Sequence, residues 1–461
     1  MTLHLYDTAT REVSEFKSLI AGEVSIYLCG ATVQAAPHIG HVRSGVNFDI
    51  LRRWLLKNGY SVTFIRNVTD IDDKILRNAI HEKMPWWAVA MKYERIFTAA
   101  YASLNVLPPT YEPRATGHIT QMIELMQRLI ENGSAYAPGN GDVYLEVRKL
   151  KRYLTLSRQN FDDLLPAADA DETYKKDVRD FALWKAAKPG DPSWPTPWGA
   201  GRPGWHLECS AMAHAYLGES FDIHAGGLDL IFPHHENEIA QSEAAGFGFA
   251  NRWLHNAWVT QSGEKMSKSL GNTLQVHEIL KNVRGIELRW YLGSAHYRSM
   301  LEYSPAALEE AATNFRRIEN FLTRSTEILG AQPSPRLGEA FTAAMHADLA
   351  VPTALATISE NLRLGNKAIT DNDQAAISKN ADEIRGALEV LGCDPFDPVF
   401  AQAAGSELTT ALDGVIKLAL TQRTAARDRK DFAAADAIRD GLAALGITIG
   451  DTAQGPRWSI N

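Results

Sequence analysis

The sequence contains 461 residues, more than one hydrophobic core usually holds, so a one-domain protein is excluded and roughly two to four domains are expected. Hydrophobic residues make up 45% and charged residues 22%, ordinary values for a globular protein, so burial of a core is expected. The net charge of −8 and the pI near 6.0 exclude a general polyanion binder, although a local basic patch could still bind RNA.

Only three cysteines occur, Cys29, Cys209 and Cys393, which argues against a disulfide framework and for a reducing compartment. The first residues lack the basic and apolar regions of a signal peptide, and no run of about 18 apolar residues occurs. We therefore expect a soluble cytoplasmic protein without a membrane partner.

A strand, a helix and a second strand are predicted in succession near the N-terminus. Apolar residues alternate over 24–28, a helical apolar stripe covers 42–55, and a second strand pattern covers 61–68. This unit predicts an α/β fold with a Rossmann-like parallel sheet, in which ligands bind at the carboxyl ends of the strands. Cys29 and residues 67–73 lie at those ends.

Residues 29–41, Cys-Gly-Ala-Thr-Val-Gln-Ala-Ala-Pro-His-Ile-Gly-His, join the first strand to the helix. A helix N-terminus presents unpaired backbone N–H groups and the positive end of the helix dipole, and Gly40 lets a ligand approach the backbone. The turn is therefore predicted to bind phosphate. The imidazoles of His38 and His41 flank it, and the thiol of Cys29 lies at its mouth.

An acidic cluster, Asp70, Asp72 and Asp73, follows the second strand. A metal site is one interpretation of three neighbouring carboxylates. A solvated helix N-terminus explains them more simply, because carboxylates are favoured near the positive end of a helix dipole.

The middle of the chain combines helices with an insertion. Residues from about 84 to 133 have helical spacing, and the glycine-rich residues 139–147 indicate a hairpin arm inserted between the halves of the sheet. The strand pattern returns at 221–223, where it is expected to complete the sheet.

The last third is predicted to be helical. From about residue 304 the sequence is rich in Ala, Leu and Glu with helical spacing, which predicts an all-α bundle. Pro352 should kink or split its middle helix. Residues 402–461 are expected to form two more helices and an irregular tail.

A metal site is suggested by four residues of the right types. His234 and Glu238 are four apart, so on a helix they share a face, and Cys29 and Cys209 could add two thiolates, a set suited to zinc. Each residue also has a plainer interpretation, since a lone buried cysteine is usually a small hydrophobic residue and a histidine pair is often a hydrogen-bonded surface feature. Their combination favours zinc.

The sequence Lys-Met-Ser-Lys-Ser at 265–269, between Gly263 and Gly271, indicates a mobile loop whose lysines could neutralise a polyphosphate. Taken alone, a solvated loop is the simpler interpretation. Its significance depends on the other motifs.

Together these motifs resemble a known family. His38-Ile39-Gly40-His41 and the 265–269 sequence are similar to the paired motifs of class I aminoacyl-tRNA synthetases. With Cys29, the chain closely resembles the cysteinyl-tRNA synthetases from its N-terminus to Trp458. Three further stretches carry the resemblance: Gly-Trp-His-Leu-Glu-Cys-Ser-Ala-Met at 204–212, His-Ala-Gly-Gly-Leu-Asp-Leu at 224–230 and Phe-Pro-His-His-Glu-Asn-Glu at 232–238.

The chain departs from the family pattern in two places. Ala31 and Gln34 stand where the family commonly has Pro and Tyr, which changes the local shape of the pocket. In the tail, Ala453, Pro456 and Arg457 replace a more usual pattern of Pro and Thr, which affects the expected anticodon contacts.

The resemblance implies one zinc ion per chain, held by Cys29, Cys209, His234 and Glu238, which selects the substrate thiol over the hydroxyl of serine. A site that rejects serine so strongly needs no editing domain. The implied cysteine pocket consists of Gly30, Thr32, Trp205, His206 and His224, although Trp205 could equally be plain core packing.

The resemblance also implies the reaction. Cysteine is activated with ATP and Mg²⁺ to cysteinyl-adenylate and pyrophosphate, and is then transferred to the terminal ribose of tRNA(Cys). Positioning and charge stabilisation can carry both steps. The implied catalytic groups are His38, His41, Lys265 and Lys268, and the implied ATP contacts are Gly40, Gly226, Gly227, Asp229 and Lys268. A tight turn alone would also need both glycines at 226 and 227.

The domain organisation implied by the resemblance has six parts. These are a Rossmann-like catalytic domain in two halves, 1–120 and 201–250, an insertion (connective) domain at 121–200, a stem-contact region with the lysine loop at 251–303, a helical bundle at 304–401 and an anticodon-binding domain at 402–461. A monomer is expected, because all these modules occur in one chain.

The C-terminal part is expected to contact tRNA through a basic cluster and an aromatic face for stacking. The candidate residues are Arg423, Arg427, Arg429, Lys430, Asp436, Asp451 and Trp458. A solvated helix face explains the charges equally well. Two other functions remain as alternatives: a cysteine:glucosaminyl-inositol ligase of mycothiol synthesis, and a non-catalytic zinc-dependent RNA-binding relative of the synthetases.

Overall fold

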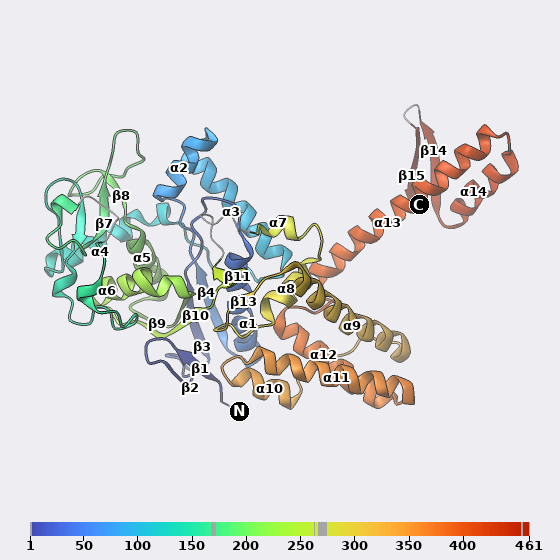
Figure 1. The fold of residues 1–461 in the computed structure, drawn as a ribbon, viewed down its shortest axis with the longest axis horizontal. Helices are drawn as coiled ribbons and strands as arrows, with labels where there is room; N and C mark the ends of the chain where they lie inside the picture. Colours follow the sequence, from blue (N-terminus) through green and yellow to red (C-terminus); the bar gives the residue numbers. More distant parts are fainter. Residues whose placement is uncertain (1, 167–171, 262, 266–273, 453–454, 461) are drawn as a thin grey trace. The chain divides into compact units, whose positions relative to one another are not determined.

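The computed structural model describes residues 2–166, 172–261, 263–265, 274–452 and 455–460 (Figure 1). The chain divides into two compact units, residues 1–394 and 395–461, which are described separately. Within the described residues, no helix is both long enough and apolar enough to cross a membrane.

A four-stranded parallel sheet forms the centre of the larger unit (Figure 1). Its order is β10 (Phe249–Asn256), β9 (Ser220–Gly227), β3 (Glu23–Leu28) and β4 (Ser61–Arg66), and all neighbours are parallel. Helix α1 (Ile39–Lys57) makes the crossover from β3 to β4. The predicted strand, helix and strand, and with them the α/β fold, are confirmed.

The edge of this sheet differs from the prediction. The strand pattern at 221–223 lies inside β9, between β10 and β3, so it does not complete the sheet. Strand β10 forms the edge and was missed, because Arg252 interrupts its apolar pattern. The Arg252 guanidinium donates to the Leu5 carbonyl and the Ser14 hydroxyl, so N-terminal strands cover this charged edge.

Helix α1 forms along the predicted apolar stripe. Val42, Val46 and Trp54 are fully buried and Ile50 is 3% exposed. Gly59, just beyond the helix, has φ of +84°, a conformation that ends helices and that other residues rarely adopt. Packing of the stripe against the sheet places the N-terminus of α1 at the carboxyl end of β3.

A second, antiparallel sheet belongs to the insertion. Its strands pair in the order β5 (Ala135–Tyr136), β6 (Val143–Leu145), β7 (Phe181–Ala186) and β8 (Gly201–Pro203). The antiparallel pairing of β5 with β6 confirms the hairpin arm. Met122, Phe181 and Leu207 lie in one core, so helices α4 (Ile119–Glu131) and α5 (Trp205–Leu217) pack with this sheet.

Short helical segments follow β9 and lead to β10. They are η5 (Leu228–Leu230), η6 (Ile231–His235) and α6 (Glu236–Ala244). Helix α5 precedes β9 and packs against α6. The two helices therefore bring the residues after 205 and after 234 to one place beside the sheet.

Helices α2 (Asp73–Glu82) and α3 (Trp86–Ser103) follow β4. The Asp72 carboxylate caps α2 by accepting from the Lys74 N–H at 2.7 Å. The predicted helix N-terminus at the acidic cluster is confirmed.

The carboxylates of that cluster are not all solvated, which corrects the prediction. Asp70 is 7% exposed and accepts the backbone N–H of Thr116 at 2.9 Å. Asp73 forms ion pairs with Lys185 and Arg202 at 3.1 and 2.5 Å. The insertion supplies these two cations, and such a distant partner is invisible in the local sequence.

The helices of the larger unit continue with α7 (Val276–Ile279), α8 (Gly285–Gly293), α9 (Pro305–Leu329), α10 (Glu339–His346), α11 (Val351–Asp371) and α12 (Gln374–Leu391). The predicted helical region is confirmed. Pro352 lies in the first turn of α11, where its missing N–H would have had no helical partner, and the predicted split is confirmed.

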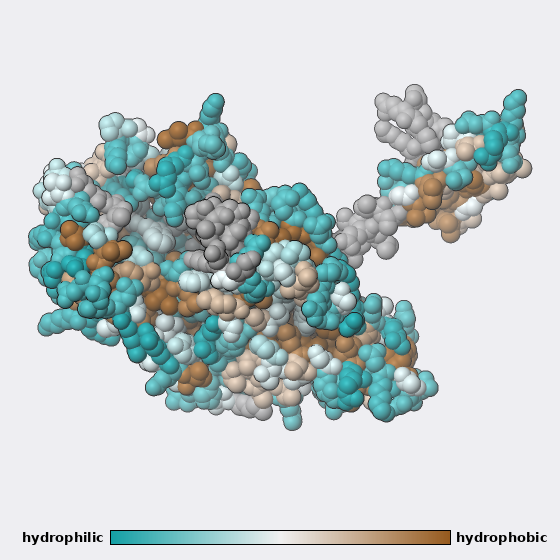
Figure 2. All heavy atoms as spheres, in the orientation of Figure 1, coloured by the Kyte–Doolittle hydropathy of each residue, from teal (hydrophilic) through white to brown (hydrophobic). Residues whose placement is uncertain are grey.

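Two small sheets complete the larger unit. One is the antiparallel pair β1 (His4–Asp7) and β2 (Glu12–Glu15), and the other has the order β12 (Glu264–Lys265), β11 (Val259–Gln261) and β13 (Leu301–Glu302). The face seen in Figure 2 is mostly hydrophilic, with apolar side chains in separate small patches.

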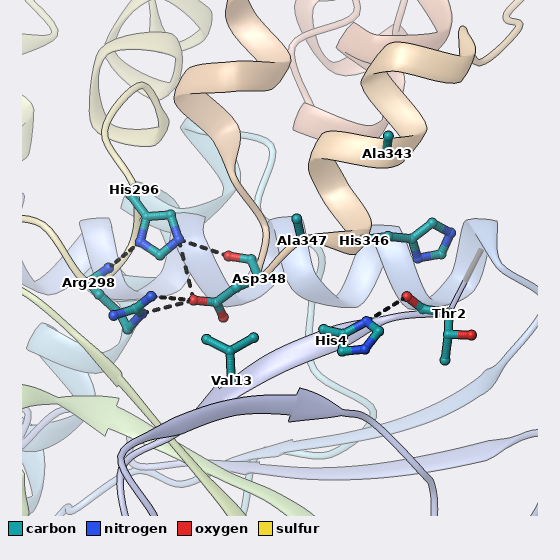
Figure 3. A pocket seen from close by; sticks show the side chains of 9 residues that line it. All are labelled: Thr2, His4, Val13, His296, Arg298, Ala343, His346, Ala347 and Asp348. Atoms are coloured by element: carbon teal, nitrogen blue, oxygen red, sulfur yellow. Dashed lines mark hydrogen bonds and ion pairs between the residues drawn. The ribbon is translucent and has the colours of Figure 1, made fainter.

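Asp348 ties the N-terminal hairpin to the helices and lies beside a surface hollow of about 700 Å³ (Figure 3). Asp348 is 5% exposed. One oxygen accepts the N–H of Tyr6 at 2.9 Å and the hydroxyl of Tyr297 at 2.7 Å. The other accepts from Arg298 at 2.6 Å. One buried carboxylate therefore joins three segments that are distant in sequence.

The smaller unit contains α13 (Pro398–Asp428), α14 (Phe432–Ala444), β14 (Ile447–Thr452) and β15 (Gly455–Ile460). Ile416, Leu420 and Ile447 form its small core. The expected irregular tail was wrong, because β14 and β15 pair antiparallel over their whole length. Gly450, Asp451, Gly455 and Pro456 lie within these short strands and interrupt their apolar pattern in the sequence.

Candidate active site and metal centre

A cavity of about 370 Å³ lies where β3, β9 and β10 end. Its position at the carboxyl ends of parallel strands is the usual ligand site of such sheets. The predicted site residues that line it are Cys29, Gly30, Thr32, His38, Gly40, His41, Trp205, Gly227 and Asp229.

Two hydrogen bonds between side chains and backbone hold the turn before α1. Nδ1 of His38 accepts the N–H of Gly40 at 3.1 Å, and Nδ1 of His41 accepts the N–H of His38 at 3.2 Å. The centroids of the two rings are 3.7 Å apart. Because each Nδ1 is an acceptor, each neutral ring carries its proton on Nε2. Two N–H donors therefore accompany the helix N-terminus.

Close packing explains two of the predicted glycines. A Cβ atom at Gly30 would lie 1.7 Å from the carbonyl oxygen of Asn67. At Gly226 it would lie 2.7 Å from the ring of His235. Gly226 does not line the cavity, so its small size serves the packing of His235.

The four predicted metal ligands, Cys29, Cys209, His234 and Glu238, come together beside the cavity. Sγ of Cys29 is 3.8 Å from Sγ of Cys209 and 3.4 Å from Oε1 of Glu238. Nε2 of His234 is 3.0 Å from the same carboxylate oxygen. One donor atom from each residue lies within 4.8 Å of the other three, so this group could hold a metal ion.

Burial changes the protonation of this group. It raises the pKa of the Cys29 thiol well above its usual value and also raises that of Cys209. It lowers the pKa of His234 to about 3. Burial alone would raise the pKa of Glu238, but His224 and His234 lower it overall. The group therefore consists of two protonated thiols, a neutral imidazole and a carboxylate. A cation bound among them would favour the deprotonated, thiolate form of the two cysteines.

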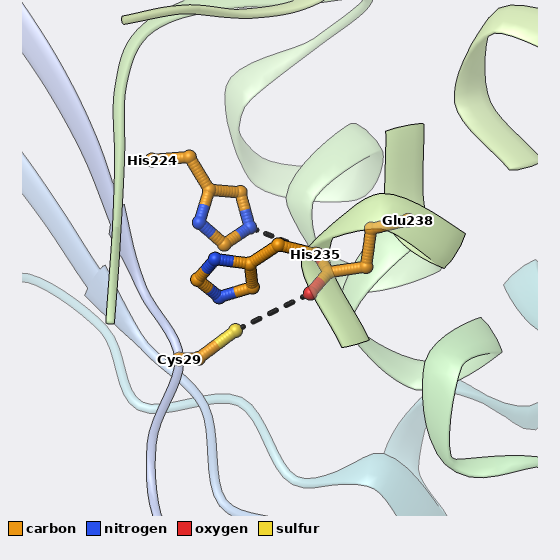
Figure 4. Close-up of side chains that lie close together, drawn as sticks. All are labelled: Cys29, His224, His235 and Glu238. Atoms are coloured by element: carbon orange, nitrogen blue, oxygen red, sulfur yellow. Dashed lines mark hydrogen bonds and ion pairs between the residues drawn. The ribbon is translucent and has the colours of Figure 1, made fainter. Parts of the chain in front are cut away.

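A second group could also hold a metal ion: Cys29, His224, His235 and Glu238 (Figure 4). It shares Cys29 and Glu238 with the first group. Nε2 of His224 is 2.8 Å from Oε2 of Glu238. Nδ1 of His235 is 2.8 Å from Nε2 of His255, so one side of that ring is already occupied.

His206 and Trp205 lie against His234. The Nδ1 atoms of His206 and His234 are 3.0 Å apart, within hydrogen-bonding distance, and the Trp205 ring stacks on His234 at 4.2 Å between centroids. Trp205 lines the cavity, whereas His206 and His224 contact the candidate ligands from behind. This arrangement fixes the ring of a metal-binding histidine.

Asp229 also lines the cavity. This residue follows β9, is exposed, and its Oδ1 accepts the indole N–H of Trp258 at 3.2 Å. Trp258 also lines the cavity. A carboxylate and an aromatic face at a strand end could bind a nucleoside.

Comparison with known proteins agrees with this geometry. Residues 15–313 match the class I (C) tRNA synthetase catalytic domain, and residues 410–458 match the cysteinyl-tRNA ligase anticodon binding domain. The cysteine–tRNA ligases of Streptomyces coelicolor and Streptomyces avermitilis are 57% and 58% identical to the chain over 464 residues. The matches cover 100% of the chain and 76% and 99% of those proteins. The chain belongs to the cysteine–tRNA ligase family. The family resemblance seen in the sequence is confirmed.

A solved structure supports the fold of this family member. The methionyl-tRNA synthetase of Mycobacterium tuberculosis in complex with methionyl-adenylate matches with a TM-score of 0.61 at 17% identity. The match covers 84% of this chain and 93% of that one. At this identity the likeness concerns the fold alone, which is that of a class I synthetase.

The lysine motif of this cysteine–tRNA ligase family member is only partly described. Lys265 lies in β12, and its backbone pairs with Thr260 of β11. Lys268, with residues 266–269, lies outside the described residues.

In the smaller unit, the predicted tRNA contacts differ in exposure. Arg427, Arg429, Lys430 and Asp436 are exposed on or between α13 and α14, whereas Arg423 is 8% exposed. The exposed residues are accessible to a nucleic acid, and most of Arg423 is covered.

The two remaining candidates lie in the terminal hairpin. In the antiparallel register of β14 and β15, Asp451 lies opposite Pro456, and Trp458 lies opposite Ile449. The side chains of Asp451 and Trp458 are outside the described part of the structure.

Several residues that line the cavity were not predicted: Ser44, Lys74, Tyr101, Asn256 and Trp258. Lys74 could have been found, because it follows the acidic cluster at the carboxyl end of β4. Tyr101 and Asn256 gave no local signal, since their positions depend on how α3 and β10 pack.

Proposed function

We propose that this chain is a cysteine–tRNA ligase. It forms cysteinyl-adenylate and pyrophosphate from L-cysteine and ATP, and then transfers cysteine to the 3′-terminal ribose of tRNA(Cys). One observation carries the proposal: the turn at 29–41 supplies both a thiol of the metal-ligand group and two imidazoles at a helix N-terminus. Membership of the family over the whole chain supports it.

In the activation step, the cysteine carboxylate attacks the α-phosphorus of ATP, and pyrophosphate leaves. The Nε2–H groups of His38 and His41 donate to the phosphates, and the backbone at Gly40 allows their close approach. Lys265 and Lys268 neutralise the charge that develops on pyrophosphate. Mg²⁺ accompanies ATP. Neither step needs a strong base from the protein, because positioning the reactants supplies most of the rate enhancement.

Asp229 is assigned to the ribose of ATP. Its carboxylate is exposed at the end of β9 and is held by Trp258, so it can accept hydrogen bonds from two adjacent hydroxyls. Gly227, which lines the same wall, leaves room for the nucleoside. Gly226 supports the wall indirectly, through His235.

A zinc ion fits the group Cys29, Cys209, His234 and Glu238. This group places both thiols on the metal, whereas the group with His224 and His235 would leave Cys209 unused 3.8 Å from Cys29. When bound, zinc supplies a soft Lewis acid that favours the thiol of cysteine over the hydroxyl of serine. His206 orients His234, and His224 orients Glu238.

The cysteine substrate then lies between this group and the turn. Gly30, Thr32 and Trp205 line the same cavity as Cys29. Trp205 is held by its stacking on His234, so it can exclude water from the substrate side chain.

The C-terminal unit is assigned to tRNA. Arg427, Arg429 and Lys430 are exposed and can contact phosphates, and Asp436, Asp451 and Trp458 are candidates for base contacts. The domain limits proposed from the sequence are retained, with 121–200 as the connective domain, 251–303 as the stem-contact region and 402–461 as the anticodon-binding domain.

A monomer in the cytoplasm is proposed. The three cysteines are unpaired, as in a reducing compartment, and catalytic and anticodon-binding family regions occur in one chain.

Cysteine-dependent exchange of pyrophosphate into ATP, followed by charging of tRNA(Cys), tests this function in one experiment. We expect both reactions. Exchange without charging, together with ligation of cysteine to glucosaminyl-inositol, would indicate the mycothiol ligase instead. Absence of exchange would indicate a non-catalytic RNA-binding relative.

A further inference from the structure

Lys74 is a basic residue of the cavity that the mechanism above does not use. It lies in the first turn of α2 and is exposed, and it lines the cavity together with His38, Gly40 and His41. Among the described residues that line this cavity, it is the only lysine or arginine. A single fixed cation in a pocket that must hold phosphates is a candidate ligand for one of them.

The backbone fixes the position of Lys74 relative to the turn. The side-chain amide of Asn78, one turn further along α2, donates to the carbonyl of Gln34 at 2.7 Å. The N–H of Val33 donates to the carbonyl of Thr69 at 3.2 Å, just before α2. These two hydrogen bonds connect the start of α2 to the 29–41 turn. The backbone at Lys74 therefore stays beside the cavity.

The acidic neighbours of Lys74 are already engaged. Asp73 forms ion pairs with Lys185 and Arg202, and Asp72 caps the backbone of α2. Within the described parts of the chain, Lys74 forms no salt bridge at 4.0 Å or less. Lys74 therefore lines the cavity without a described carboxylate to neutralise it, and the N-terminal end of α2 adds to the positive potential.

We infer that Lys74 binds a phosphate group of a substrate in this cavity. This inference rests on the proposed function, and the phosphate has two possible sources. One is the α-phosphate of ATP, which stays in the adenylate. The other is a phosphodiester at the 3′ end of tRNA, which enters the same cavity to accept cysteine. Either contact is a charge-assisted hydrogen bond, whose loss corresponds to roughly a tenfold to hundredfold effect.

The test compares Lys74→Met with Arg77→Met in the full-length, zinc-loaded enzyme. Arg77 is an exposed cation on the same helix that does not line the cavity, so it controls for the loss of one charge from α2. Lys74→Arg tests whether a cation alone restores function. Thermal unfolding of each variant checks the fold, and an unchanged midpoint is expected because Lys74 is exposed and has no described ion-pair partner.

Two assays distinguish the sources of the phosphate. The first is cysteine-dependent pyrophosphate exchange without tRNA, with KM for ATP and kcat measured separately. The second is single-turnover transfer of cysteine from preformed enzyme-bound adenylate to saturating tRNA(Cys). A contact with the α-phosphate lowers exchange about tenfold or more in Lys74→Met. A contact with tRNA leaves exchange intact and slows transfer by a similar factor.

In both cases, Arg77→Met should match the wild type and Lys74→Arg should recover most of the loss. The assignment would be overturned if Lys74→Met kept wild-type rates in both assays. It would also be overturned if Arg77→Met lost as much activity as Lys74→Met. If the wild-type enzyme itself performs neither exchange nor transfer, the proposed function fails, and this assignment fails with it.

Discussion

The Sγ atoms of Cys29 and Cys209 lie 3.8 Å apart, although 180 residues separate them in the sequence. Strand β3 ends one residue before the first thiol, and helix α5 carries the second. Both thiols are next to the carboxylate of Glu238 in a space where burial raises their pKa values. A divalent cation bound between the thiols would offset the cost of ionising them in a buried space, since it favours the thiolate form.

Cys209→Ser should therefore lose zinc. A hydroxyl is a much poorer zinc ligand than a thiolate, so we expect zinc affinity to fall by about tenfold or more, with weaker binding of cysteine. Zinc content after dialysis against a weak chelator measures the first effect, and KM for cysteine in exchange measures the second.

Cys393→Ser is the matched control, because Cys393 is equally buried but lies outside the metal group. It should keep its zinc. Full zinc content in Cys209→Ser, together with loss of zinc in His235→Asn, would contradict our choice and favour the group with His224 and His235.

His38→Asn should separate the structural role of His38 from its catalytic role. Asparagine can cap α1 as the imidazole does, by accepting from a backbone N–H, but it cannot place an Nε2–H at the phosphates. We expect an unfolding midpoint close to that of the wild type and exchange slower by roughly 10²- to 10³-fold.

His38→Ala should lose both functions. Removal of the cap costs about 1 kcal/mol of stability, in addition to the loss of exchange. Thermal unfolding and exchange, measured on the same preparations, check this. Normal exchange in His38→Asn would mean that His38 only caps the helix.

Asp348→Ala should destabilise the larger unit. The change leaves the hydroxyl of Tyr297 and the guanidinium of Arg298 without their buried acceptor, which costs about 2 to 4 kcal/mol. A lower denaturant midpoint is the expected observation. Asp371→Ala is the control: its exposed pair with Lys367 should contribute less than about 1 kcal/mol. Equal shifts in the two variants would refute the role given to Asp348.

Acid should destabilise the protein through its buried imidazoles. Burial lowers the pKa of His206, His234 and His255 to about 3, whereas an unfolded histidine titrates near 6.5. Between these values only the unfolded chain takes up the protons, so stability is lost as the pH falls below about 6.5. Each group contributes about 1.4 kcal/mol per pH unit well inside this window.

His255→Gln removes one of these groups and can keep a hydrogen bond to Thr8. When the pH is lowered from about 7 to about 5, the midpoint of thermal unfolding should fall less in this variant than in the wild type. His277→Gln, at an exposed histidine of α7, should leave the fall unchanged. An unchanged fall in His255→Gln would show that His255 is not responsible for the acid sensitivity.

Sequence reasoning succeeded where the signal is local. The stripe on α1 and the spacing of His234 and Glu238 follow from helical periodicity, and their burial confirms it. Sequence reasoning failed where an interaction partner is distant in the chain. The charged Arg252 made the β10 segment look polar, although the N-terminal hairpin covers the Arg252 side chain in the folded protein.

The same limit applies to the site. Asp70 was expected to be solvated, because its partner Thr116 is far along the chain. Tyr101 and Asn256 were not predicted to line the cavity, because their positions there depend on how α3 and β10 pack. Cys29, Cys209, His234 and Glu238 could be proposed together from the sequence, because their side-chain chemistry is unusual enough to be recognised before their positions are known, and the structure brings them close together.

The convergence of β3, α5 and α6 on one small space has a mechanical consequence. An ion held by Cys29 and Cys209 would act as a crosslink that closes a loop of 180 residues, and that loop contains the whole insertion. Long loops are costly to close entropically, so such a crosslink restrains the opening of this part of the chain. An ion bound there would then also connect the end of β3 to helix α5.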